Sequence, residues 1–214
     1  YISPRFGNTT SAAARAGFFL PQIIPISIAG LLWTWMLSSQ TGIVNKVLTD
    51  WGHPEWAQNW LGDAKWAMFS VTIVLIWIQV GYTIVIFMSG LARADQSVHE
   101  AAAIDGANPR QIFRKITLPL LLQILSPLLI ASFAFNFNNF NLIYLLTGGG
   151  PRKELDGEIA GATDILISYT YKIAFGTGTQ DLGLASAISL IIFVLVASIS
   201  LYSLKKSKVL ETFG

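Results

Sequence analysis

The chain has 214 residues, of which 53% are hydrophobic and only 12% are charged. An ordinary soluble domain has about 25% charged residues, so this composition indicates a protein that places its apolar surface in a membrane. The net charge of +2 is too small to indicate nucleic-acid binding, and the absence of cysteine excludes disulfides, thiolate metal sites and cysteine nucleophiles.

Four long runs of the sequence contain no Asp, Glu, Lys or Arg: residues 16–45, 66–92, 116–151 and 182–204. Each is longer than the roughly 20 residues that a helix needs to cross a hydrocarbon layer about 30 Å thick. We therefore predict an all-α polytopic membrane protein with spans near residues 16–38, 67–91, 119–146 and 182–204.

Basic residues are distributed unevenly among the segments that connect these spans. Nine of the 14 Lys and Arg residues lie in 1–15, 93–118 and 205–214, whereas 39–65 and 152–181 contain more acidic than basic residues. Because positively charged loops tend to stay in the cytoplasm, we predict a cytoplasmic N-terminal segment, a central cytoplasmic loop and a cytoplasmic tail. The sequence starts at Tyr1 without a signal-peptide pattern, and we expect it to be the C-terminal part of a longer protein.

The central loop, residues 93–118, has a clear local pattern. Residues 95–103 favour a helix, and Gly106 can adopt the left-handed backbone conformation that ends it. Asn108 and Pro109 then have the residue types of an N-cap and a first helical position. Two short helices with a bend at Gly106 are predicted. On these features alone, a docking element for a cytoplasmic partner and a plain loop on the lipid headgroups are equally good interpretations.

The identity and spacing of residues in this loop resemble the EAA signature of ABC importer permeases. The matching residues are Glu100-Ala101-Ala102, then Gly106, then Ile116-x-Leu118-Pro119. In that family the loop forms a coupling helix that seats in a cleft of the ATPase subunit. The resemblance implies that Glu100 pairs with a basic residue of the ATPase, and that the coupling surface comprises Glu100, Ala101, Ala102, Gly106 and Ala107.

Further stretches resemble the maltose/maltodextrin branch of the same family. They are SFAFNFNNF followed by LIYLLTGGGP, and SYTYKIAF followed by GTGTQDLGLASAIS. The resemblance extends from about residue 15 to the tail and is strongest over 98–190. It implies the transmembrane domain of an ABC type I importer, with the last four spans of a six-helix core present in residues 16–204.

Asn136, Asn138, Asn139 and Asn141 lie within the third predicted span. An amide at membrane depth needs a hydrogen-bond partner, so these side chains should face protein or a water-filled cavity. In a continuous helix, Asn136 and Asn139 would share one face next to Phe135. Amides beside an aromatic ring suit a neutral carbohydrate, although hydrogen bonds between spans are the alternative. The family resemblance implies that Phe135, Asn136 and Asn139 contact sugar in a mid-membrane cavity.

Two further pairs correspond to sugar-contacting positions of maltose-type permeases, but with other side chains. Gln22 and Ile26 stand where Tyr and Ser are found, and Gln79 and Thr83 stand where Leu and Tyr are found. Each pair has the i, i+4 spacing of an inward helical face, so Gln22, Gln79 and Thr83 join the predicted substrate-binding residues while the exact sugar stays open. Proline on both sides of Gln22 indicates either a cavity-lining break or a packing kink.

Several kinds of site have no support in the sequence. There is no G-x-x-x-x-G-K-[ST] phosphate loop, so the chain is not expected to bind ATP. His53 and His99 fall in loops predicted on opposite sides of the membrane, where each is expected to be solvated or interfacial rather than a metal ligand. No carboxylate pair lies within a span, which argues against proton coupling. We expect no catalytic residue, no metal and no cofactor.

The apolar spans and the family resemblance together imply a non-enzymatic permease subunit of a bacterial ABC importer for maltose or maltodextrin, in the plasma (inner) membrane. The implied partners are a cytoplasmic ABC ATPase dimer, a second permease subunit and an extracellular or periplasmic sugar-binding protein. One alternative is another di- or oligosaccharide, such as a galacto-oligosaccharide or trehalose. A second alternative is a membrane receptor or scaffold whose central loop docks a signalling partner.

Overall fold

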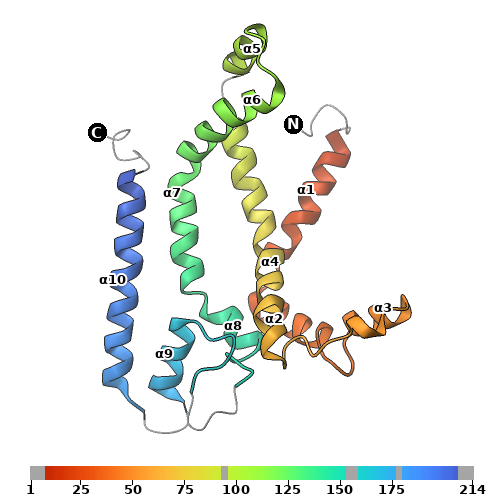
Figure 1. Cartoon of the computed structure of the whole chain (residues 1–214), viewed down its shortest axis with the longest axis vertical. Coiled ribbons are helices and arrows are strands. Elements are labelled where there is room, and N and C mark those ends of the chain that lie inside the picture. The colour runs from red at the N-terminus through yellow and green to blue at the C-terminus, as the bar shows by residue number, and fades with distance from the viewer. Residues whose placement is uncertain (1–7, 93–95, 153–158, 177–179, 207–214) are drawn as a thin grey trace. The chain divides into compact units, whose positions relative to one another are not determined.

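The computed structural model describes residues 8–92, 96–152, 159–176 and 180–206 (Figure 1). Parts of the segments predicted to be cytoplasmic, with Arg5, Arg93 and Lys208, lie outside these ranges. The described part of the chain is helical apart from turns and one isolated bridge between Arg152 and Gly161, which confirms the all-α prediction. The helices are α1 Asn8–Ile23, α2 Ile26–Met36, α3 Ile43–Asp50, η1 Pro54–Trp56, α4 Ala64–Ala92, α5 Gln96–Ile104, α6 Pro109–Ile112, η2 Phe113–Thr117, α7 Leu118–Phe137, α8 Phe140–Leu146, α9 Leu166–Phe175 and α10 Leu182–Lys206.

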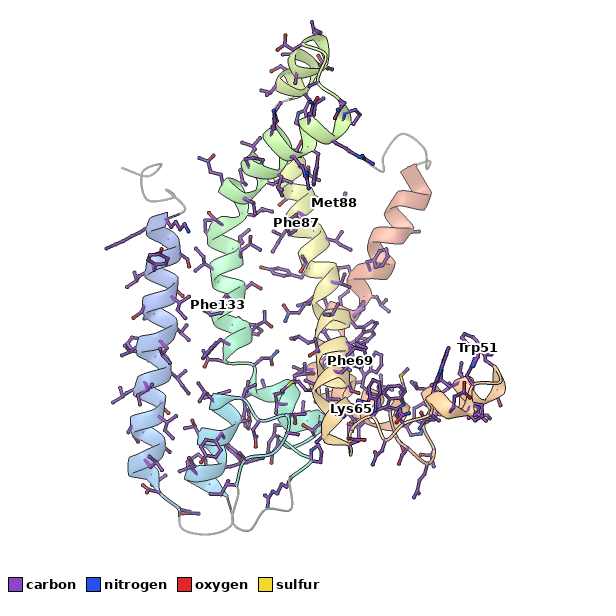
Figure 2. The ribbon with its side chains drawn as sticks, in the orientation of Figure 1. Trp51, Lys65, Phe69, Phe87, Met88 and Phe133 are labelled. Atoms are coloured by element: carbon purple, nitrogen blue, oxygen red, sulfur yellow. The ribbon has the colours of Figure 1, made fainter. Side chains whose placement is uncertain are left out.

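Within the described residues, three uninterrupted helical stretches are long and apolar enough to cross a membrane: Ala64–Leu91, Pro109–Phe137 and Leu182–Lys206. They coincide with the second predicted span, most of the third and the fourth. Large apolar side chains on these helices are exposed, as with Phe69 at 51% and Phe133 at 40% (Figure 2). Such surfaces suit contact with lipid or with other membrane-embedded protein.

The first predicted span is not one continuous helix. Residues 16–23 belong to α1 and residues 26–36 to α2, and the two are bent by 102°. Pro25 causes the break, because it has no backbone N–H to donate and disfavours helical geometry at the residue before it. Pro25 instead precedes α2 with φ −53° and ψ 134°, and the break falls beside Gln22. If the bent pair forms one span, the described residues hold four spans; the alternative is a re-entrant loop.

The third predicted span is broken as well. α7 ends at Phe137 and α8 begins at Phe140, so residues 138 and 139 lie outside both helices. Asn139 has φ −77° and ψ 68°, and the N–H of Phe140 donates to the carbonyl of Asn138 at 2.8 Å. Asparagine is a weak helix former, because its amide competes for nearby backbone groups. Two asparagines in succession therefore interrupt an otherwise apolar helix.

The chain divides into two compact units. Unit 1 comprises Tyr1–Gly81 and Asn138–Phe193, and unit 2 comprises Tyr82–Phe137 and Val194–Gly214. The core of unit 1 brings together α2, α4 and α8, with buried residues Leu37, Val71, Val74, Leu142, Ile143 and Leu146. Gly30 of α2 is buried against Leu145 of α8, so the two short helices pack closely.

In unit 1, α1 crosses α4 at Gly81. A methyl group at Gly81 would overlap the backbone of Phe18 and Phe19, so only glycine allows this approach. The two helices meet backbone to backbone at this point, as helices in membranes commonly do at small residues.

A polar network fixes the segment between α8 and α9 in unit 1. The carboxylate of Asp164, 4% exposed, accepts from Lys172 Nζ at 2.6 Å, from the Gly161 N–H at 2.7 Å and from the Ser168 hydroxyl at 2.8 Å. The backbone of Gly149, with φ +84°, runs against this ion pair and leaves no room for a side chain. The buried charges are therefore compensated by an ion pair and by hydrogen bonds.

Candidate functional site

The central loop has the predicted bent form, and all of it that is described belongs to unit 2. α5 ends at Ile104, and Gly106 follows in the left-handed region with φ +79°. Asn108 caps α6 through a reciprocal pair: its side chain accepts from the Gln111 N–H at 2.9 Å, and its own N–H donates to the Gln111 side chain at 2.8 Å. Pro109 occupies the first position of α6. The Asn108–Gln111 hydrogen bonds and Pro109 thus determine where α6 begins after the turn.

The EAA residues present a small, accessible surface on this turn. Glu100, Ala101 and Gly106 are exposed, and Ala102 and Ala107 are half-buried. The N–H of Ala107 donates to the carbonyl of Ala102 at 3.0 Å, which holds the turn against the end of α5. A cleft of about 320 Å³ lies beside the turn, lined by Asp105, Gly106, Ala107, Gln111, Ile112, Lys115 and Ile116. The predicted coupling residues therefore lie together on one exposed bend with a single acidic side chain among them.

His99 differs from the sequence prediction. It was expected to be solvated or interfacial, but it is half-buried and its Nε2 lies 2.9 Å from the hydroxyl of Thr117, at the end of η2. Thr117 is only 8% exposed. The sequence offered no signal for this contact, because the two residues are 18 positions apart and meet only when the loop folds back.

On α7, the predicted sugar-contacting residues differ in their surroundings. Phe135 is 71% exposed, so its ring is available to a partner or ligand. Asn136 is half-buried, and its amide donates to the Ser132 carbonyl at 2.8 Å and to the Ser132 hydroxyl at 3.3 Å. Ser132 was absent from the predicted site, although its position four residues earlier on a helix makes this contact regular. It fixes the orientation of the Asn136 amide.

The argument that placed Asn136 and Asn139 on one helical face is wrong. Asn136 belongs to α7, whereas Asn139 lies in the break before α8, where helical spacing does not apply. Asn139 is half-buried, and its side chain makes no capping hydrogen bond to α8. Its placement in irregular backbone within an apolar segment is itself a feature of cavity-lining positions in membrane proteins.

The remaining candidates lie on α1 and α4. Gln22 is exposed near the end of α1, and Ile26 begins α2, so these two residues do not form the predicted pair on one helix. Gln79, half-buried, and Thr83, exposed, are four residues apart on the continuous α4 and share a face as predicted. Gln22, Gln79 and Asn139 fall in unit 1, whereas Thr83, Phe135 and Asn136 fall in unit 2. That they line one cavity stays a prediction.

The sequence is similar to known membrane transport proteins. It is 45% identical over 198 residues to a Vibrio cholerae protein named maltose/maltodextrin transport system permease protein MalF, an alignment that covers 92% of this chain and 37% of that protein. The protein of the same name in Escherichia coli K12 is 42% identical over 92% of this chain and 38% of its own length. The chain therefore spans little more than a third of the length of these curated relatives.

The fold is also similar to that of a solved transporter. A chain in the crystal structure of a bacterial alginate ABC transporter, in complex with a periplasmic protein bound to alginate pentasaccharide, matches with a TM-score of 0.78. That match has 22% sequence identity and covers 95% of this chain and 67% of the other, so it supports the fold alone. The family model described as "Binding-protein-dependent transport system inner membrane component" matches residues 2–207. This chain belongs to the family of binding-protein-dependent transport system inner membrane components.

Proposed function

We propose that the chain is part of the permease subunit of a bacterial ABC importer that carries maltose or maltodextrins. The observation that carries the proposal is the EAA sequence on an exposed, capped bend between two membrane-spanning helices. The 42–45% identity of the chain to proteins named maltose/maltodextrin permeases supports the choice of cargo. The full subunit works with an ATPase dimer, a second permease subunit and a sugar-binding protein outside the membrane.

The bend formed by α5, Gly106 and α6 is the surface that binds the ATPase. Glu100 supplies the negative charge that pairs with a basic side chain, and the small residues Ala101 and Gly106 let the partner approach closely. The sequence has no phosphate loop of its own, so ATP is hydrolysed by the partner. Closure of the ATPase dimer moves the bend, and the spans joined to it open the cavity outward and then inward.

The sugar site is built from uncharged groups. Phe135 offers an aromatic face, and Asn136 and Asn139 offer amides that can donate to and accept from hydroxyl groups. Gln22, Gln79 and Thr83 supply further polar groups. A neutral oligosaccharide fits such a lining, because its hydroxyls satisfy amides while its apolar ring face packs on an aromatic ring.

Transport of a panel of sugars tests the choice of cargo. In proteoliposomes that contain the full-length permease, its second permease, the ATPase and the binding protein, uptake of labelled maltose and maltotriose should exceed that of trehalose or raffinose. The expected ratio is at least about tenfold, because a site that hydrogen-bonds one sugar leaves polar groups unpaired with another. Equal or faster uptake of trehalose or raffinose would contradict the assignment.

Charge reversal at Glu100 tests the docking surface. In the Glu100→Lys variant, like charges face each other across the interface, and we expect the affinity for the ATPase to fall by roughly 100-fold. Co-purification of the ATPase with tagged permease measures this loss. Glu55→Lys is the matched control, since Glu55 is also an exposed acid but lies on η1 in a segment predicted to face outward. A stable ATPase complex with Glu100→Lys would count against the surface.

A further inference from the structure

The contact between His99 and Thr117 ties α5, the first helix of the bend at Gly106, to the start of α7. His99 lies in the middle of α5, and Thr117 is the last residue of η2, a π-helical turn that leads directly into α7. The His99 Nε2 and the Thr117 hydroxyl are 2.9 Å apart, and both residues belong to unit 2. The hydrogen bond therefore closes a loop of chain around α6.

This contact occurs where α5 meets the rest of unit 2. Among residues 97–104, whose exposure the structure describes, His99 and Ala102 are half-buried and the others are exposed. Ala102 contributes a methyl group and no side-chain hydrogen bond. The imidazole of His99 thus supplies a directional contact on the half-buried side of α5, whereas the next two residues, Glu100 and Ala101, are exposed.

The turn that holds Thr117 is also unusual, because it is π-helical. π-Helical turns are rare and occur frequently at functional sites, because the extra residue weakens the regular hydrogen-bond ladder. Thr117 is buried at the end of this turn, and its hydroxyl lies 3.5 Å from the carbonyl of Ile112, five residues earlier. A hydroxyl between the Ile112 carbonyl and the His99 imidazole links the widened turn to α5.

We propose that His99 is a positioning residue for energy coupling: its hydrogen bond to Thr117 makes α5 and the start of α7 move as one body. When the ATPase displaces α5, the displacement passes through Thr117 into α7, which carries Phe135 and Asn136 toward its other end. Without the bond, α5 swings about the left-handed Gly106 turn, and part of the displacement is lost before it reaches α7. The proposal rests on the proposed docking of an ATPase at α5.

Distance measurements by pulsed electron paramagnetic resonance test the link without any ATPase. Spin labels are attached to Ala103→Cys in α5 and Leu122→Cys in α7, both of which are exposed positions. This chain has no cysteine, so labelling is specific once any cysteine elsewhere in the full-length permease is replaced. We expect one narrow distance distribution in the labelled parent and in His99→Gln, because the Gln amide reaches the place of Nε2. Thr117→Val, which keeps the side-chain shape, and His99→Phe, which keeps a flat aromatic ring, both remove the hydrogen bond and should broaden the distribution at least twofold. An unchanged distribution in Thr117→Val overturns the link.

Coupling efficiency in the reconstituted transporter tests the role of the link. In His99→Phe and Thr117→Val, ATP hydrolysed per sugar imported should rise about threefold or more, while the ATPase still co-purifies. His99→Gln should restore the parental ratio, and the double variant His99→Phe/Thr117→Val should be no worse than either single variant. A parental ratio in both single variants overturns the coupling role even if the distances broaden. If no ATPase co-purifies with the parent, the proposed function fails, whereas the distance measurement still decides the link.

Discussion

Replacing Asn139 with alanine is expected to lower sugar uptake by about tenfold or more without unfolding the permease. The side chain makes no capping hydrogen bond to α8, so its loss leaves the helix start intact. Its amide lies in the irregular backbone between α7 and α8, where membrane-embedded ligand sites commonly form. An amide that binds a sugar hydroxyl away from bulk water contributes about 1–3 kcal/mol when its partner would otherwise stay unpaired.

The measurement is uptake of labelled maltose in proteoliposomes at a concentration well below saturation. Asn141→Ala is the matched control, because Asn141 is an exposed asparagine on α8 only two residues away, and its replacement should leave uptake unchanged. Gel filtration and ATPase co-purification of Asn139→Ala should match the parent. Normal uptake by Asn139→Ala would remove this residue from the sugar site.

The second large effect concerns stability. Asp164→Ala is expected to lower the free energy of unfolding by about 3–5 kcal/mol, because it leaves the Lys172 ammonium buried without its counter-charge. Lys172 is 14% exposed, and Asp164 is its partner at 2.6 Å. The same change also strips hydrogen-bond acceptors from the Gly161 N–H and the Ser168 hydroxyl.

Thermal unfolding of the purified full-length permease in detergent measures this loss. Glu55→Ala is the control, since the ion pair of Glu55 with His53 is exposed, at 59% and 47%, and its removal should change stability by less than about 1 kcal/mol. The double variant Asp164→Leu/Lys172→Met should recover much of the stability, because neither charge then stays buried alone. Equal unfolding temperatures for Asp164→Ala and Glu55→Ala would show that the buried pair is not important for stability.

The bend formed by α5, Gly106 and α6 was predictable because its geometry depends on residues next to one another. Gly106 sets the left-handed turn, and Asn108 and Pro109 start α6. None of these three residues needs a contact with a distant part of the chain to have this effect. The apolar lengths of α4 and α10 were predictable for a similar reason: a span is a property of one uninterrupted run.

Interruptions within apolar runs were harder to predict. The run from 116 to 151 contains no charged residue and was predicted as one span to 146, yet two asparagines end α7 at Phe137. The helical-face argument for Asn136 and Asn139 failed because it assumed a single helix through both. The partners of His99 and Asp164 depend on how the chain folds back on itself, which a reading of local pattern does not supply.

The glycine contact between α1 and α4 limits how these two helices of unit 1 can move against each other. Because the two backbones touch at Gly81, sliding one helix along the other would drive a side chain into a place where only a hydrogen atom fits. Rotation about the contact point keeps the separation of the two backbones at Gly81 unchanged. A rotation about this crossing would move Gln22, four residues beyond Phe18, farther than Gln79, which lies only two residues before Gly81.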